Sequence, residues 1–135
     1  MTIPESLQHY AEPSLIVVAD HYHARLLLAF EDSVEEVDII ELPRTELSDN
    51  EGKEIGQERS DDSRLNRFVK MVAESVNTLI RDEEAAMNLH LIAPADVLNP
   101  LKKELAPEAS NIIGKELALD VAKEDELSIL KRLAA

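Results

Sequence analysis

The stretch Ser14-Leu-Ile-Val-Val-Ala-Asp20, followed after a short polar turn by Ala24-Arg-Leu-Leu-Leu-Ala-Phe30, decides the fold that this sequence predicts. Both runs are short and apolar, and the first is rich in β-branched residues, which is typical of a central strand covered on both faces. The polar segment Asp20-His-Tyr-His23 between them is a suitable hairpin connection. The sequence therefore predicts an antiparallel pair of strands at the start of the fold.

The segments that follow first add a strand and then alternate between helix and strand. A third strand is predicted at Glu36–Leu42, and a long acidic loop, Pro43–Asp62, follows it. The expected order is then helix, strand, helix, strand, helix, at Ser63–Asp82, Leu89–Ala93, Asn99–Leu105, Asn111–Asp120 and Lys123–Ala134. The first of these helices is expected to bury one apolar stripe, and the last is expected to face the sheet: the stripe is Leu65, Phe68, Val69, Val72, Val76, Leu79 and Ile80, and the sheet-facing residues are Leu127, Leu130 and Leu133. A meander followed by alternating helices and strands predicts an α/β fold with a mixed five-stranded sheet.

The length of 135 residues predicts one domain. We place this single α/β domain at residues 14–135, after an N-terminal extension at residues 1–13. Residues 44–62 lack apolar periodicity and predict a loop of a length that is usually functional or mobile. Asn99-Pro100 predicts the N-cap and the first position of the helix at Asn99–Leu105. Gly114 predicts a bulge in the last strand.

Composition restricts the chemistry. The net charge of −14, from 28 acidic and 14 basic residues, repels phosphate backbones, so nucleic-acid binding is expected only at a local basic patch. The absence of cysteine excludes disulfides, thiolate catalysis and cysteine-based zinc sites. There is no secretory signal and no apolar run long enough for a bilayer. We therefore expect a cytoplasmic protein with no cofactor and no membrane partner.

Three motifs together resemble a known family: Leu15-Ile-Val-Val-Ala-Asp-His-Tyr-His-Ala-Arg-Leu26, Leu91-Ile-Ala-Pro94, and Gly114-Lys-Glu-Leu-Ala-Leu-Asp120. This order resembles the bacterial host-attachment protein family, over most of Leu15–Leu133. Proteins of that family look like a lone middle domain of the eukaryotic and archaeal peptide-release factors. The resemblance therefore implies a release-factor-like fold, and the predicted element order is also that of the ribonuclease-H-like layout. The family name implies a role in attaching bacteria to a host.

The release-factor likeness implies one catalytic candidate. Those factors carry Gly-Gly-Gln in the long loop, and this chain carries Ile55-Gly56-Gln57 ahead of the helix that opens at Ser63. Ile55 departs from the first glycine, whose backbone torsions isoleucine cannot adopt. In the release factors this loop must enter the RNA-lined peptidyl-transfer centre, where an acidic loop is disfavoured. Gln57 is therefore a candidate for peptidyl-tRNA hydrolysis, and a coincidental or vestigial Gly-Gln is the interpretation that we favour.

A basic patch lies at the junction of the loop and the helix, formed by Arg59, Arg64, Arg67 and Lys70. The last three are spaced three apart, so they lie close together on one helix face. Together with Gly56 and Gln57 they form the candidate binding surface for a protein partner, the ribosome or RNA. The other interpretation, which we favour from the sequence, is that these cations pair with the loop's own carboxylates, such as Glu58 and Asp61.

Two weaker candidates concern metal ions. Asp20 and Asp96 follow the first and fourth strands, which are neighbours in a ribonuclease-H-like sheet, so they could share Mg²⁺. A two-metal nuclease needs three or four converging acids, and no third is evident. The alternative is that Asp20, at the end of a strand, is a turn residue, and that Asp96 is a turn or cap residue. His21 and His23 could form a partial metal site with Asp20, but histidines at a hairpin tip are more often turn residues, and we expect no metal.

The sequence thus favours a non-enzymatic cytoplasmic interaction domain, with translation components as candidate partners. The alternative is a hydrolase, either release-factor-like through Gln57 or a metal-dependent nuclease through Asp20 and Asp96. The edge of the third strand would permit a homodimer, unless Glu36, Asp38 and Glu41 protect that edge.

Overall fold

The structure is a computed structural model that describes residues 1–42, 57–83 and 86–135, and of residues 57–62 and 82–83 the backbone alone. One five-stranded sheet organises it, in the strand order β3-β2-β1-β4-β5. The strands are β1 (Ser14–Ala19), β2 (His23–Phe30), β3 (Ser33–Glu41), β4 (Asn88–Ile92) and β5 (Ile113–Leu117). The predicted fold class, α/β with a mixed five-stranded sheet, is confirmed.

Strand direction places several strand ends at one edge of the sheet. β2 is antiparallel to both of its neighbours, β1 and β3, whereas β4 is parallel to β1 and to β5. Consequently β1, β3, β4 and β5 all run the same way and end at the same edge, which we call the carboxyl edge. In open α/β sheets this is where ligands bind.

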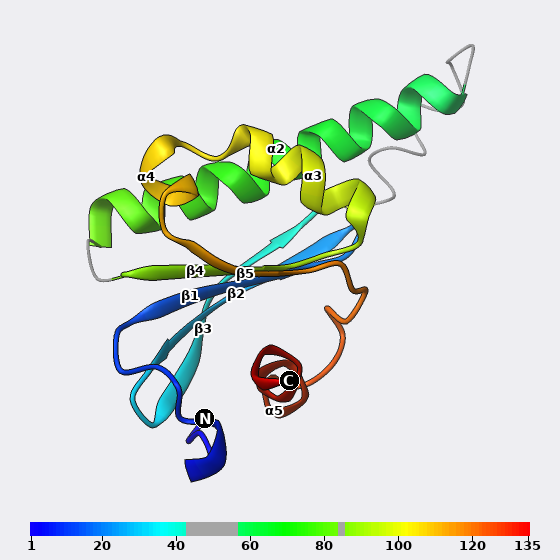
Figure 1. The fold of residues 1–135 in the computed structure, drawn as a ribbon. Coiled ribbons are helices and arrows are strands. Elements are labelled where there is room, and N and C mark those ends of the chain that lie inside the picture. Colours follow the sequence, from blue (N-terminus) through cyan, green and yellow to red (C-terminus); the bar gives the residue numbers. More distant parts are fainter. Residues whose placement is uncertain (43–56, 84–85) are drawn as a thin grey trace.

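Helices cover both faces of the sheet (Figure 1). On one face lie α2 (Gln57–Glu83), α3 (Ala95–Glu104) and α4 (Pro107–Ser110), and on the other lie α5 (Glu126–Ala134) and the 3-10 helix η1 (Glu5–Leu7). No helix among the described residues is both long and apolar enough to cross a bilayer.

The contact surface under α2 is mainly apolar, with one side-chain hydrogen bond, from Ser75 of α2 to Asp38 of β3. Phe68, Val72 and Val76 of α2 are buried against sheet residues such as Leu26 and Leu89. These helix residues belong to the stripe that the sequence predicts, since residues four apart lie on one side of a helix.

The opposite face carries a smaller apolar cluster. Leu130 and Leu133 of α5 are buried in it, as the sequence predicts, and so is Ile129. The N-terminal extension contributes Ile3, Leu7 and Tyr10 to the same cluster, so residues 1–13 are packed as part of the fold.

Two helices begin earlier than predicted. α2 begins at Gln57, inside the segment predicted as loop, because Gln, Glu and Arg are good helix formers even without an apolar stripe. Its first turns extend past the sheet, where no apolar face is needed (Figure 1). α3 begins at Ala95, with Pro100 inside the helix rather than at its first position, because Val97, Leu98 and Leu101 form a buried face that requires the earlier start.

Two predictions near the C-terminus differ in outcome. α5 begins at Glu126, three residues later than expected, because the Asp125 carboxylate accepts the Ser128 N–H at 2.8 Å and caps the helix there. The bulge predicted at Gly114 is confirmed by the register, since Leu89 pairs with Ile113 but Leu91 pairs with Glu116. A Cβ at Gly114 would lie 2.8 Å from Cε1 of His90, so a side chain at this position would displace the imidazole ring.

Candidate functional site

A polar pocket of about 740 Å³ lies at the carboxyl edge, and we call it the edge pocket. One wall is the turn after β1 together with the end of β3, and the other is the segment that leads from β5 to α5. Its lining residues are Asp20, His21, Tyr22, His23, Glu41, Leu42, Asp120, Val121, Lys123 and Glu124.

Asp20 builds the first wall by shaping the turn. It is buried, and its Oδ1 accepts the backbone N–H groups of Tyr22 at 2.7 Å and His23 at 2.6 Å. An aspartate that binds the backbone two residues on is a common device for closing turns. In the structure Asp20 is therefore a turn residue, which is the alternative to metal binding.

His23 stands between two carboxylates. Its Nδ1 lies 3.6 Å from Oδ1 of Asp20, and its Nε2 lies 3.8 Å from Oε1 of Glu41. Both distances exceed hydrogen-bond length, and Nδ1 is buried with no hydrogen-bond partner among the described residues. The imidazole is thus close to two acids and hydrogen-bonded to neither.

His21, which also lines the pocket, binds Asp96 of α3. The distances from its Nε2 to the two carboxylate oxygens are 2.8 and 3.0 Å. Asp96 therefore contacts an imidazole, while Asp20 contacts the backbone, and the two acids paired in the nuclease hypothesis have separate partners. Within the described ranges, no group of three or more His, Cys, Asp or Glu residues is arranged to hold a metal ion.

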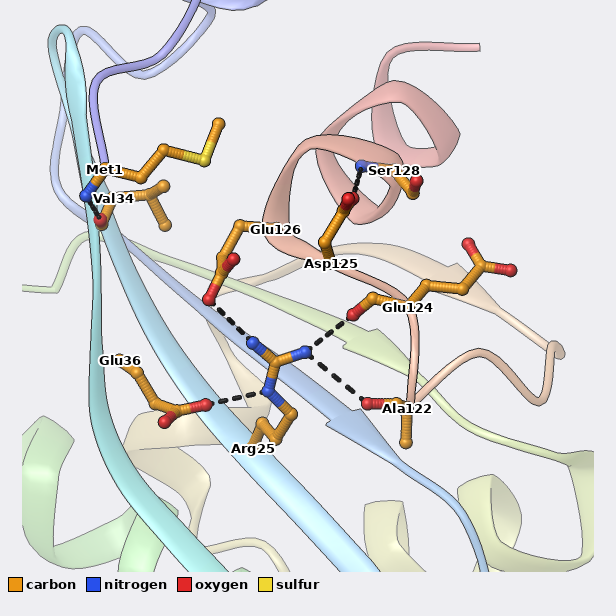
Figure 2. A network of polar contacts seen from close by, with 9 residues as sticks. All are labelled: Met1, Arg25, Val34, Glu36, Ala122, Glu124, Asp125, Glu126 and Ser128. Atoms are coloured by element: carbon orange, nitrogen blue, oxygen red, sulfur yellow. Dashed lines mark hydrogen bonds and ion pairs between the residues drawn. The ribbon is translucent and has the colours of Figure 1, made fainter.

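The second wall is held by Arg25 of β2 (Figure 2). Its Nη1 donates to the carbonyls of Glu124 at 2.7 Å and Ala122 at 3.4 Å, and its Nη2 and Nε donate to Glu126 and Glu36, both at 2.7 Å. This set of contacts, which we call the Arg25 latch, ties the chain between β5 and α5 to the sheet. It fixes the position of residues 120–124 and with them half of the pocket lining.

Glu124 is also restrained from α5. Nε and Nη2 of Arg132 donate to its two carboxylate oxygens, each at 2.8 Å. The hydrogen bond from Arg132 lowers the pKa of Glu124, and the carboxylate in turn raises the pKa of Arg132. Glu124 is therefore ionised and already paired at neutral pH.

The basic face of α2 begins at the rim of this pocket. The Arg64 guanidinium lies 5.1 Å from the centroid of the Tyr22 ring, which is the geometry of a cation–π contact. Arg64 is partly exposed, and Arg67 and Lys70 are exposed. The structure thus brings Arg64, one of the predicted binding residues, next to the hairpin turn, a proximity that the sequence did not reveal.

The remaining predicted binding residues lie at the boundary of the described part of the chain or outside it. Gly56 is outside the described residues, as are the side chains of Gln57 and Arg59. The backbone of Gln57 forms the first position of α2 rather than part of a loop.

Several lining residues were not predicted as site residues. Glu41 is the last residue of β3, and Asp120 and Lys123 follow β5. A signal was available for the two acids, because the ends of strands that run the same way meet at one edge. Applying that rule to the third and fifth strands, as well as to the first and fourth, would have found them.

One protein-family model matches this chain. The model of the family described as "Protein required for attachment to host cells" matches residues 48–133, which is more than half of the chain. The chain belongs to this host-attachment family. The resemblance stated from the sequence motifs is therefore confirmed. Among curated proteins, a sequence comparison finds no match.

Solved structures show the same fold in proteins of very different sequence. An archaeal translation termination factor, aRF1, is similar with a TM-score of 0.58 and 14% identity, over 90% of this chain and 37% of that chain. A structure titled "Archaeal protein" has a TM-score of 0.55 and 14% identity, over 88% and 35%. The ethanolamine utilization protein EutJ from Carboxydothermus hydrogenoformans has a TM-score of 0.50 and 9% identity, over 82% and 47%.

The chain therefore spans between about a third and a half of the length of these structures. Its likeness to a release factor, predicted from the sequence, is confirmed at the level of the fold.

Proposed function

We propose that this protein is a non-enzymatic interaction domain of the cytoplasm that binds its partner through Arg64, Arg67 and Lys70. The observation that carries the proposal is the contact of Arg64 with Tyr22. It joins a cationic helix face to the rim of the edge pocket, so that a helix and a turn distant in sequence form one continuous surface.

The contacts made by the acidic residues of the site favour a binding function over a catalytic one. Oδ1 of Asp20 accepts two backbone N–H groups, and both oxygens of Asp96 contact the imidazole of His21. A carboxylate that closes a turn or pairs with a neighbouring side chain is engaged in holding the fold. The contacts in this part of the molecule therefore support a shaped surface rather than a reactive centre.

The ribosome is the partner that we propose. Support comes from the fold shared with a translation termination factor and from the match between arginine side chains and phosphate oxygens. With a net charge of −14 the chain is repelled by RNA at long range, so binding would depend on the few cations of this face. Affinity should accordingly fall as salt rises.

The test is co-sedimentation with bacterial ribosomes at low and at physiological salt. We expect Arg64→Glu/Arg67→Glu to reduce the pelleted fraction at least about tenfold, because two phosphate contacts are replaced by repulsion. The matched control is Lys103→Glu/Lys131→Glu, which makes the same change of charge at two exposed lysines of α3 and α5.

Equal loss in both variants would mean that net charge alone governs sedimentation, and the proposed surface would be wrong. Absence of binding by the unmodified protein at both salt concentrations would overturn the ribosome as partner.

A further inference from the structure

The edge pocket has a charge opposite to that of the basic face beside it. Four carboxylates reach it from three segments of the chain, through Asp20, Glu41, and Asp120 with Glu124, and Lys123 is the lysine in its lining. Apolar surface is present as well, from Leu42 and Val121. A pocket that combines carboxylates with apolar and aromatic walls suits an organic cation better than a hydrated metal ion.

Two of the four acids retain capacity for a ligand. Asp20 is engaged by backbone N–H groups and Glu124 by Arg132. By contrast, Glu41 lies 3.8 Å from the imidazole of His23, beyond hydrogen-bond length. Asp120 is exposed, and no hydrogen bond or ion pair joins it to another residue in the described part of the chain. These two carboxylates lie on opposite walls.

The imidazole of His23 gives an independent indication. Its Nδ1 is a buried polar atom without a hydrogen-bond partner among the described residues, although Oδ1 of Asp20 is only 3.6 Å away. Buried nitrogen atoms are normally paired. The wall that carries Glu41 therefore contains a polar atom whose hydrogen bond is not made within the described residues.

The rim shows which cation the surface accommodates. The guanidinium of Arg64 already lies over the ring of Tyr22, which lines the pocket. A guanidinium is planar, stacks on aromatic rings and carries five N–H donors, so one such group can contact two carboxylates at once.

We propose that the edge pocket binds the guanidinium of an arginine side chain presented by a protein partner. Glu41 and Asp120 accept its N–H groups from the two walls, and the apolar lining contacts its aliphatic stem. The site adjoins the α2 face at Tyr22 but is built from other residues, and the proposal does not require that the partner be a ribosome.

The probe is N-acetyl-L-arginine amide, added to the full chain while backbone amide resonances are followed by NMR. We expect saturable shifts at residues 20–23 and 120–124, with a Kd in the millimolar range, about 4 kcal/mol. N-acetyl-L-citrulline amide, which has the same shape without the charge, should bind at least about tenfold more weakly. N-acetyl-L-lysine amide should bind several-fold more weakly than arginine because it is not planar.

Paired substitutions locate the site. Glu41→Gln/Asp120→Asn should weaken arginine binding at least about tenfold, since each removes one charged acceptor. Both residues are exposed, so the fold should be retained, as checked by circular dichroism. The control Glu104→Gln/Glu108→Gln removes the same charge at two exposed acids outside the pocket and should bind as the unmodified protein does.

Three outcomes would overturn the proposal: equal binding of arginine and citrulline, equal binding of arginine and lysine, or shifts that persist in Glu41→Gln/Asp120→Asn. None of them alters the sedimentation test, because that test changes residues of α2 that do not line the pocket. The two proposals can therefore fail separately.

Discussion

The two faces of the sheet are held by different physical means. Under α2 the contact is mainly apolar and is formed by buried side chains such as Phe68, with one hydrogen bond from Ser75 to Asp38. Under α5 the apolar cluster is smaller, and the Arg25 latch supplements it with three directed hydrogen bonds to residues 122, 124 and 126 (Figure 2). Hydrophobic burial is non-directional, whereas a guanidinium fixes its partners in place. The first face therefore supplies stability, and the second positions a wall of the edge pocket.

The largest effect is expected from breaking the apolar face. Phe68→Ala removes a side chain with no exposed surface and should lower the free energy of unfolding by about 3–5 kcal/mol, measured by urea denaturation. Phe30→Ala, at a phenylalanine that is 41% exposed, is the matched control and should cost less than about 1 kcal/mol. Equal costs would contradict the assignment of stability to the α2 face.

A smaller and more local effect is expected from breaking the Arg25 latch. Arg25→Met leaves two carboxylates and two carbonyls without their donor and should cost about 2 kcal/mol, less than a fully buried pair because the side chain is 18% exposed. Amide shifts should concentrate at residues 120–126, and arginine binding in the edge pocket should weaken.

The matched variant is Arg25→Lys, which keeps the charge but cannot donate to all four partners at once. It should restore part of the stability and little of the pocket geometry. If the shifts spread evenly across the α2 face, the latch would not be a local positioning device.

The smallest effect concerns pH and His90 of β4. Burial first, and then the nearby Lys115, lower the pKa of His90 below its ordinary value of 6.5. The unfolded chain therefore binds this proton more readily, so the contribution of His90 to stability is present above pH 6.5 and is lost as the pH falls toward the lowered value.

The comparison variant is His90→Asn, which can still accept the Lys115 N–H that Nδ1 of His90 accepts at 3.0 Å. Denaturation curves on either side of pH 6.5 should show a smaller loss of stability for the variant on acidification. An equal loss would assign the acid sensitivity to other groups.

Much of this fold could be predicted from the sequence, because its strands are short apolar runs and α2, after its first turns, has a regular stripe of apolar residues. Such patterns record which residues face a core. The start of α2 could not be found in this way, since Gln57 and its neighbours form a helix from backbone propensity alone. The periodicity of a sequence reports burial and does not detect a helix that extends beyond the sheet.

The site could be predicted only in part. Turn chemistry correctly indicated what Asp20 does, because that role depends on residues two and three positions away. The contact of His21 with Asp96 and the contact of Arg64 with Tyr22 join residues far apart in the chain. The second wall of the pocket likewise exists only once α5 has docked.

The Arg25 latch has a consequence for the order of folding. Its contacts with residues 122, 124 and 126 span 97, 99 and 101 positions in the chain. Closing so long a loop costs entropy before any contact offsets it. We therefore expect the hairpin and the α2 layer to form first and the latch to close last. During synthesis, β1, β2 and α2 could fold while the edge pocket still lacked a wall, so its binding competence would arrive with the final segment of the domain.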